Sequence, residues 1–158
     1  MSIRNLTHGA LTIEDGAAAT LTIPIEEGNL QFTVRREAIV ILNRGTLASM
    51  AEGMEEAMAV SFAFKFEEWR GETASSGSAV SPADALRQVG NASGWTSTLA
   101  CGPYCVDLTF MITAPSGCGE QDEELTFPDF HADEVQFQEG EEYDIVNVTG
   151  KCLALEPT

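Results

Sequence analysis

A strictly alternating segment near the middle of the chain, residues 60–66, constrains the fold more than any other feature. Its apolar positions are Val60, Phe62, Phe64 and Phe66. A period of two is expected of a β-strand that buries one face. The segment follows an acidic, methionine-bearing stretch, residues 44–59, which we expect to be a long inter-strand loop. Because loops of this length in compact domains are commonly functional, we expect it to reach another subunit.

The segments before this strand also have the pattern of β-structure. Residues 10–14 and 21–25 flank an Asp-Gly dipeptide at 15–16, which predicts a hairpin because glycine tolerates the positive φ of tight turns. Residues 38–42 form a continuous apolar run. Such a run is typical of a strand that is covered on both faces.

The second half of the chain predicts one helix and further strands. Ser81 can cap a helix over residues 81–90, and Pro82 suits its first turn because the missing N–H has no intrahelical partner there. Strands are expected at residues 106–112, 125–130, 135–137 and 143–148. We therefore expect one domain, residues 1–158, that is mainly β: an antiparallel β-sandwich or partly closed barrel with one flanking α-helix.

The charge of the chain is strongly one-sided. The 158 residues include 25 acidic and 8 basic side chains, for a net charge of −17. Such a field repels nucleic acid and anionic membranes, so a conventional DNA-binding role is excluded. Solubility alone is a sufficient explanation of the acidity. The hydrophobic fraction of 44% argues against disorder despite the charge.

Nothing in the sequence indicates membrane insertion or export. No apolar run approaches the length of a membrane span, and residues 1–10 lack the apolar centre of a signal peptide. We therefore expect the protein to be made in a cytoplasm. In that compartment the 4 cysteines are expected to be thiols rather than disulfides.

The sequence carries little that points to catalysis. His8 and His131 are its histidines, and no carboxylate pair is set apart by an apolar environment. No nucleophile elbow or phosphate-binding glycine loop is present. We expect neither an enzyme nor a cofactor.

The cysteines leave three alternatives open. Cys101, Cys105, Cys118 and Cys152 could together hold a zinc ion. Structural zinc sites usually contain two closely spaced cysteine pairs, whereas here one such spacing is followed by two lone residues. A disulfide is the second alternative. The third is a set of small, buried or half-buried thiols, which requires no ligand.

The order of six segments along the chain is distinctive: residues 9–13 (GALTI), 39–45 (IVILNRG), 60–66 (VSFAFKF), 105–110 (CVDLTF), 125–129 (LTFPD) and 138–141 (QEGE). In this order of segments the chain resembles the tail tube proteins of long-tailed, siphovirus-like bacteriophages. These segments span most of the chain. They are patterns of strands and turns rather than catalytic residues.

The resemblance implies a structural virion protein located in the phage tail and assembled in the host cytoplasm. Tail tube proteins form hexameric rings that stack into a hollow cylinder, contact other tail proteins, and let DNA pass without specific binding. The long loop then corresponds to the segment that reaches the adjacent ring. Its expected contact residues are Arg44, Gly45, Leu47, Met50, Met54 and Met58. The methionines, four residues apart, could instead form a short helix on their own domain.

The same resemblance gives the acidity a second explanation, because an acidic lumen would not retain passing DNA. The face that lines the lumen is not defined by the sequence. Two other roles remain open: a related ring protein of the tail, such as a terminator or baseplate component, and a zinc-stabilised β binding module.

Overall fold

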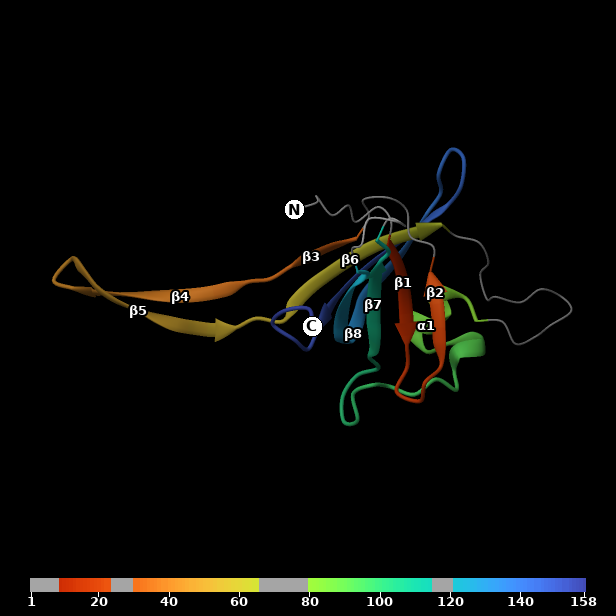
Figure 1. Cartoon of the computed structure of the whole chain (residues 1–158), viewed down its shortest axis with the longest axis horizontal. Coiled ribbons are helices and arrows are strands. Elements are labelled where there is room, and N and C mark those ends of the chain that lie inside the picture. Colours follow the sequence, from red (N-terminus) through yellow and green to blue (C-terminus); the bar gives the residue numbers. More distant parts are fainter. Residues whose placement is uncertain (1–8, 24–29, 66–79, 115–120) are drawn as a thin grey trace, which may run out of the picture.

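The computed structural model describes residues 9–23, 30–65, 80–114 and 121–158. These residues form one seven-stranded antiparallel sheet, a separate two-stranded ribbon and one short α-helix (Figure 1). The mainly β, antiparallel fold expected from the sequence is confirmed. The strand order in the large sheet is β2-β1-β7-β8-β9-β6-β3.

One long strand converts the seven-stranded sheet into two layers. β8 (Glu123–Gln138) pairs through its first half with β7 (Val106–Ile112) and through its second half with β9 (Ile145–Cys152). Near the change of partner, Asp129 has a φ of 50° and the ladder register shifts. Strands that switch sheets in this way form the corners of sandwiches. The sequence predicted two strands where β8 is continuous.

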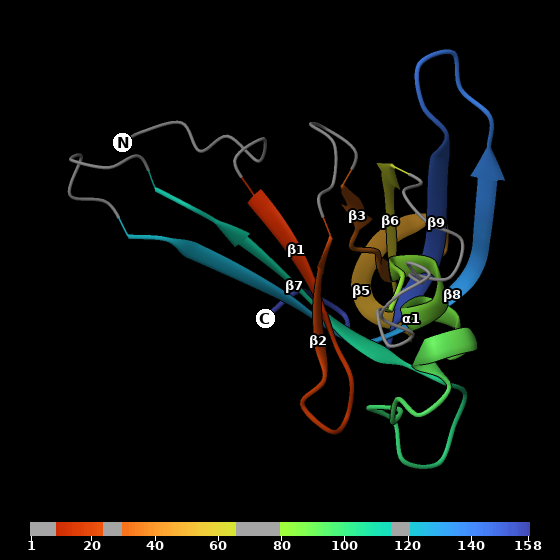
Figure 2. The ribbon, with the colours of Figure 1, turned by 90° about the vertical axis from the view of Figure 1, so that its right-hand side faces the viewer.

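The remaining strands complete the two layers (Figure 2). β1 (Gly9–Glu14) and β2 (Thr20–Ile23) extend the layer that contains β7 and the first half of β8. β6 (Met58–Lys65) and β3 (Gln31–Thr33) extend the layer that contains β9 and the second half of β8. Phe32 and Phe127 meet across the interior with ring centroids 5.3 Å apart, so the two layers share one core.

The alternating segments bury the faces that their sequences predict. In β6 and β7, inward side chains are at most 4% exposed; they are Met58, Val60, Phe62, Phe64, Val106, Leu108, Phe110 and Ile112. Phe66 lies outside the described residues. This burial of large apolar side chains is the principal source of stability of the body, by which we mean the two sandwich layers and α1.

The predicted helix is present as α1 (Pro82–Arg87). The Ser81 hydroxyl accepts a hydrogen bond from the Asp84 N–H at 3.2 Å, and the helix ends where Gln88 adopts a left-handed conformation with a φ of 56°. Ala85 and Leu86 are buried, and α1 contacts β8 and β2. No helix within the described ranges is long and apolar enough to cross a membrane.

The first hairpin forms where the sequence predicts it, but for a different reason. The positive φ in its loop belongs to Ala18, at 69°, and not to Gly16. A Cβ at Gly16 would lie 2.5 Å from the Ser97 carbonyl oxygen. Glycine is therefore required there by close approach of another chain segment rather than by turn geometry.

The expected loop at residues 44–59 is not a loop. β4 (Arg36–Asn43) and β5 (Thr46–Glu55) pair as an antiparallel hairpin that projects from the body as an arm (Figure 1). Its two-residue turn has positive φ at both Arg44 (51°) and Gly45 (82°), as a type I′ turn requires. The expectation of a loop is corrected: β5 is a strand because it pairs with β4.

Candidate assembly surfaces

The most unusual surface of the molecule is the arm, which we define as β4, its turn and β5. Every residue of β4 is exposed, and the large apolar side chains of the arm are exposed by 47% to 80%. They are Ile39, Val40, Ile41, Leu42, Leu47, Met50 and Met54. Contiguous exposed apolar surface of this kind marks sites of interaction with another molecule.

Both faces of the arm are apolar. Val40 lies opposite Met50 on one face, while Ile39 and Ile41 occupy the other face opposite Ala51 and Ser49. The sequence predicted a strand covered on both faces, and the described residues cover neither face. A partner that covered the whole apolar surface of the arm would have to contact both sides of the ribbon.

In the part of the chain that the structure describes, the arm joins the sandwich at its base (Figure 1). A two-stranded ribbon is marginally stable by itself in water. The extensive element contacts of β4 and β5 are those with each other. A partner that covers the apolar faces would therefore stabilise the arm.

The C-terminal segment, residues 153–158, contacts this base. Arg36 forms an ion pair with Glu156, and the Met58 N–H donates to the Ala154 carbonyl at 3.0 Å. Thr158 pairs through its backbone with Thr126 of β8, with N–O distances of 2.8 and 2.9 Å. The segment thus joins the arm to the layer that contains β7 and the first half of β8.

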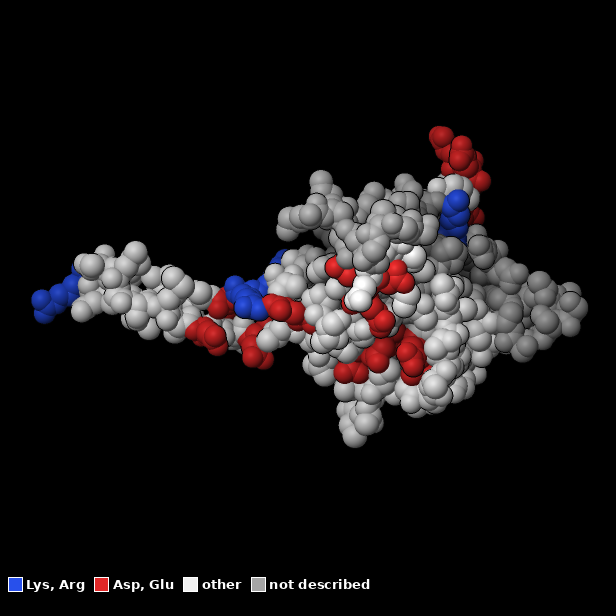
Figure 3. Space-filling view, in the orientation of Figure 1, with Lys and Arg blue, Asp and Glu red and all other residues white. Residues whose placement is uncertain are grey.

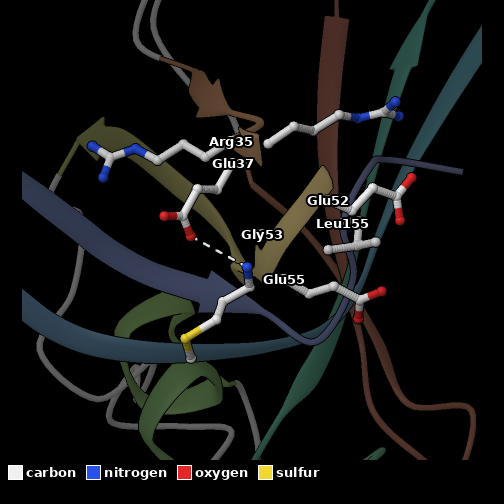
Figure 4. Close-up of a pocket in the computed structure, with 8 residues that line it drawn as sticks. Arg35, Glu37, Glu52, Gly53, Glu55 and Leu155 are labelled. Atoms are coloured by element: carbon white, nitrogen blue, oxygen red, sulfur yellow. Dashed lines mark hydrogen bonds between the residues drawn. The ribbon is translucent and has the colours of Figure 1, made fainter. Parts of the chain in front are cut away.

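A pocket of about 270 Å³ opens between the arm base and this segment (Figure 4). Its walls combine charged residues with two exposed apolar side chains. The lining residues are Arg35, Arg36, Glu37, Glu52, Gly53, Met54, Glu55 and Leu155. Glu37 is fixed by the Met54 N–H, which donates to its carboxylate at 3.2 Å (Figure 4).

A second candidate surface is the outer face of the layer formed by β2, β1, β7 and the first half of β8. Its central row is a ladder of four aligned threonines, one from each strand: Thr22, Thr12, Thr109 and Thr126. The neighbouring row places Glu14 opposite Asp107. Hydroxyl and carboxylate groups therefore dominate this face.

Figure 3 shows acidic side chains gathered over this part of the body. The described strands β1, β2 and β7 and residues 123–130 of β8 contain no lysine or arginine. The other layer is different, because Lys65 of β6 and Lys151 of β9 lie at exposed positions. This second layer also carries the exposed Asp133 and Glu134 of β8, so it presents charges of both signs, whereas the charged side chains on the described strands of the first layer are all acidic.

Five of the six predicted contact residues lie together in the arm. Arg44 and Gly45 form its turn, and Leu47, Met50 and Met54 are exposed on β5. Met58 does not belong with them: it is 0% exposed in the core, at the start of β6. The expectation for Met58 is corrected.

Its position could have been predicted from the sequence, because Met58 continues the inward period of Val60, Phe62 and Phe64. Ile39, Ile41 and the C-terminal residue of the pocket, Leu155, were not among the predicted contact residues. An exposed arm has no burial period, so no sequence pattern marked these residues as surface.

The cysteines do not come together as a metal site within the described ranges. No group of three or more His, Cys, Asp or Glu residues there could hold a metal ion. Cys101 is exposed, Cys105 and Cys152 are buried, and Cys118 lies outside the described residues. Burial, together with nearby Asp107 and Asp129, raises the pKa of the Cys152 thiol to about 12, so that thiol stays protonated and unreactive.

His131 has a structural environment. Its Nδ1 lies 2.8 Å from the Tyr104 carbonyl oxygen, and its Nε2 lies 3.9 Å from an Asp133 carboxylate oxygen. The arm-base pocket is lined by other residues. His8 lies outside the described residues.

Together, the fold and surfaces define a two-layer β-sandwich domain with a projecting hairpin arm. No protein-family model matches the chain, and no curated protein matches its sequence. Among solved structures, it is similar to a chain of the anti-feeding prophage (AFP) baseplate, determined by cryo-EM with 6-fold symmetry imposed. The TM-score is 0.53 at 9% identity, over 98% of this chain and 95% of the other. At this identity the likeness shows a shared fold.

Proposed function

We propose that the protein is a structural component of a phage-tail particle, a tail tube protein whose hexameric rings stack into a hollow conduit for DNA. The observation that carries the proposal is the arm, an ordered ribbon with apolar side chains on both faces. A monomer gains nothing from such a surface, whereas a repeating assembly covers it. The proposed role is structural, without catalysis, and its location is the virion tail.

The fold likeness supports the same class of protein. The solved neighbour belongs to a phage-derived baseplate of six-fold symmetry, and it matches this chain over nearly its whole length. Six-fold rings use heterologous contacts, in which one patch binds a different patch on the next copy. The proposed partners are therefore other copies of the chain and other tail proteins.

We propose that the acidic outer face of the layer formed by β2, β1, β7 and the first half of β8 lines the lumen of the tube. We assign the face carrying Glu14, Asp107 and the threonine ladder to the inside, because in the described strands it offers no cation to DNA phosphates. Uncharged hydroxyls and carboxylates would let DNA pass without attachment. The layer carrying Lys65 and Lys151 would then face outwards.

A second candidate role is a single ring at the baseplate or at the end of a tail. It is favoured by the baseplate origin of the solved neighbour. Both roles use the same fold and the same ring contacts. They differ in whether one ring can bind another identical ring.

Electron microscopy of the purified protein, with sedimentation to measure its mass, tests both roles. Hollow cylinders of stacked six-fold rings would support a tube protein, whereas rings that never stack would support the second role. A chain that stays monomeric at high concentration would contradict both. Zinc analysis on the same sample tests the remaining alternative, since a zinc-stabilised domain would unfold on chelation.

A further inference from the structure

The two ends of the arm carry charges of opposite sign that form no ion pair with described residues. Arg44 at the tip forms no ion pair with any described residue. At the base, Arg35 and Arg36 are paired with Glu56 and Glu156. Glu52 and Glu55 also line the base pocket, but they form no ion pair within the described part of the chain. One end thus offers a cation, and the other offers two carboxylates.

The apolar groups at the two ends are complementary as well. At the tip, Leu42 lies opposite Leu47, and they are 58% and 75% exposed. At the base, Met54 and Leu155 line the pocket and are 80% and 42% exposed. Methionine adapts to irregular partner surfaces, which suits a pocket that receives leucine side chains. Each end therefore combines exposed apolar surface with a charge of opposite sign.

We propose that the tip of the arm of one copy docks in the arm-base pocket of a second copy. Arg44 lies between the carboxylates of Glu52 and Glu55, and the two tip leucines cover Met54 and Leu155. The inference rests on the proposed function, because it requires a repeating assembly of this chain. It adds the receiving surface, which includes the C-terminal segment.

This contact has a defined geometry. Tip and pocket lie at opposite ends of the same arm, so each docked copy still presents its own tip to another copy. When the arms of successive copies point the same way, this heterologous contact propagates in one direction, whereas two antiparallel arms would close it on a pair. The proposed contact has the first arrangement, which the mass of the assembly distinguishes from a dimer. Successive copies are offset by the length of the arm, which is about 25 Å for eight residues of β-strand. The contact therefore suits the join between stacked rings.

Charge reversal with restoration tests the contact. Arg44→Asp reverses the tip, and aspartate tolerates the positive φ of that position. The pocket is reversed by Glu52→Arg with Glu55→Gln; glutamine is chosen at 55 because that residue lies opposite Arg36. Each reversal alone should raise the concentration required for assembly by at least about tenfold, and the two together should restore it to within about threefold.

The matched control is Glu139→Arg with Glu141→Gln, which changes the net charge equally at exposed positions of the β8–β9 turn. This control should assemble like the native chain. Circular dichroism melting establishes that each variant is folded. As a further measurement, mixing the tip variant with the pocket variant should restore assembly, since each then meets a complementary partner.

The outcomes separate this inference from the proposed function. If the native chain assembles and the tip and pocket variants assemble equally well, the docking contact is wrong and the pocket serves another molecule, while the tube role stands. The same conclusion follows if folded single variants fail but the combined variant is not restored. If the native chain never assembles, the proposed function and the contact both fail.

Discussion

Asp15 shows how a single buried side chain fixes a loop against the body. Its carboxylate accepts hydrogen bonds from the N–H groups of Ala17, Ala19 and Thr96, at 2.9, 2.7 and 2.9 Å. Burial alone would raise its pKa, but the three donors outweigh burial and lower the pKa below its usual value. The residue thereby ties the first hairpin to the segment before β7.

We predict that Asp15→Asn lowers the free energy of unfolding at pH 7 by about 1–3 kcal/mol, because an amide cannot accept all three bonds. A lowered folded-state pKa gives stability that is present above the unfolded pKa and is lost as pH falls through the folded pKa. The difference between native chain and variant should therefore shrink below about pH 4. Urea unfolding at several pH values measures it, and a difference that persists unchanged at pH 2 would contradict this role.

Met58 and Met50 make contrasting predictions for the same residue type. Met58→Ala should cost about 2–5 kcal/mol of unfolding free energy, because Met58 is 0% exposed in the core. Met50→Ala should change that stability by no more than about 0.5 kcal/mol, because Met50 is 71% exposed, and should weaken assembly instead. Urea unfolding and sedimentation measure the two effects. Equal destabilisation by both substitutions would show that Met50 packs against its own domain.

At the scale of the element, the exposed apolar side chains of the arm lead us to predict that both of its faces are covered in the assembly. Val40→Asp and Ile41→Asp place a charge on opposite faces of the ribbon. Each should abolish assembly while leaving the melting of the body unchanged, because a buried unpaired charge is costly only where a partner covers it. Electron microscopy and circular dichroism provide the readout. Normal assembly by either variant would show that its face stays in solvent.

Elements differ in how far their sequence predicts them. β6 and β7 bury one face, so their periods of two were visible, and the capping Ser81 marked α1. β5 was missed because its alanine, methionine and glutamate residues favour helix, while pairing with the β-branched residues of β4 determines the strand. The pocket was missed because it joins residues 35–55 to Leu155, a proximity that depends on tertiary structure.

At the scale of the whole molecule, the distribution of charge predicts whether an assembled ring binds DNA. Glu14→Lys with Glu124→Lys places cations on the outer face of the acidic layer. Assembled variant particles should bind double-stranded DNA at about 50 mM salt and release it as salt rises, whereas native particles should not bind. The control, Glu139→Lys with Glu141→Lys, alters the β8–β9 turn instead. Failure of the first variant to bind DNA, or equal binding by the control, would contradict the assignment of the acidic layer to the lumen.

The most direct test of the central claim is a cryo-EM reconstruction of the assembly formed by the native chain. We predict six-fold rings in which the layer with Glu14 and the threonine ladder lines the lumen. We also predict that each arm is covered on both faces by neighbouring copies, with Arg44 beside Glu52 of another subunit. A lumen lined by Lys65 and Lys151, or arms that extend bare into solvent, would contradict the account.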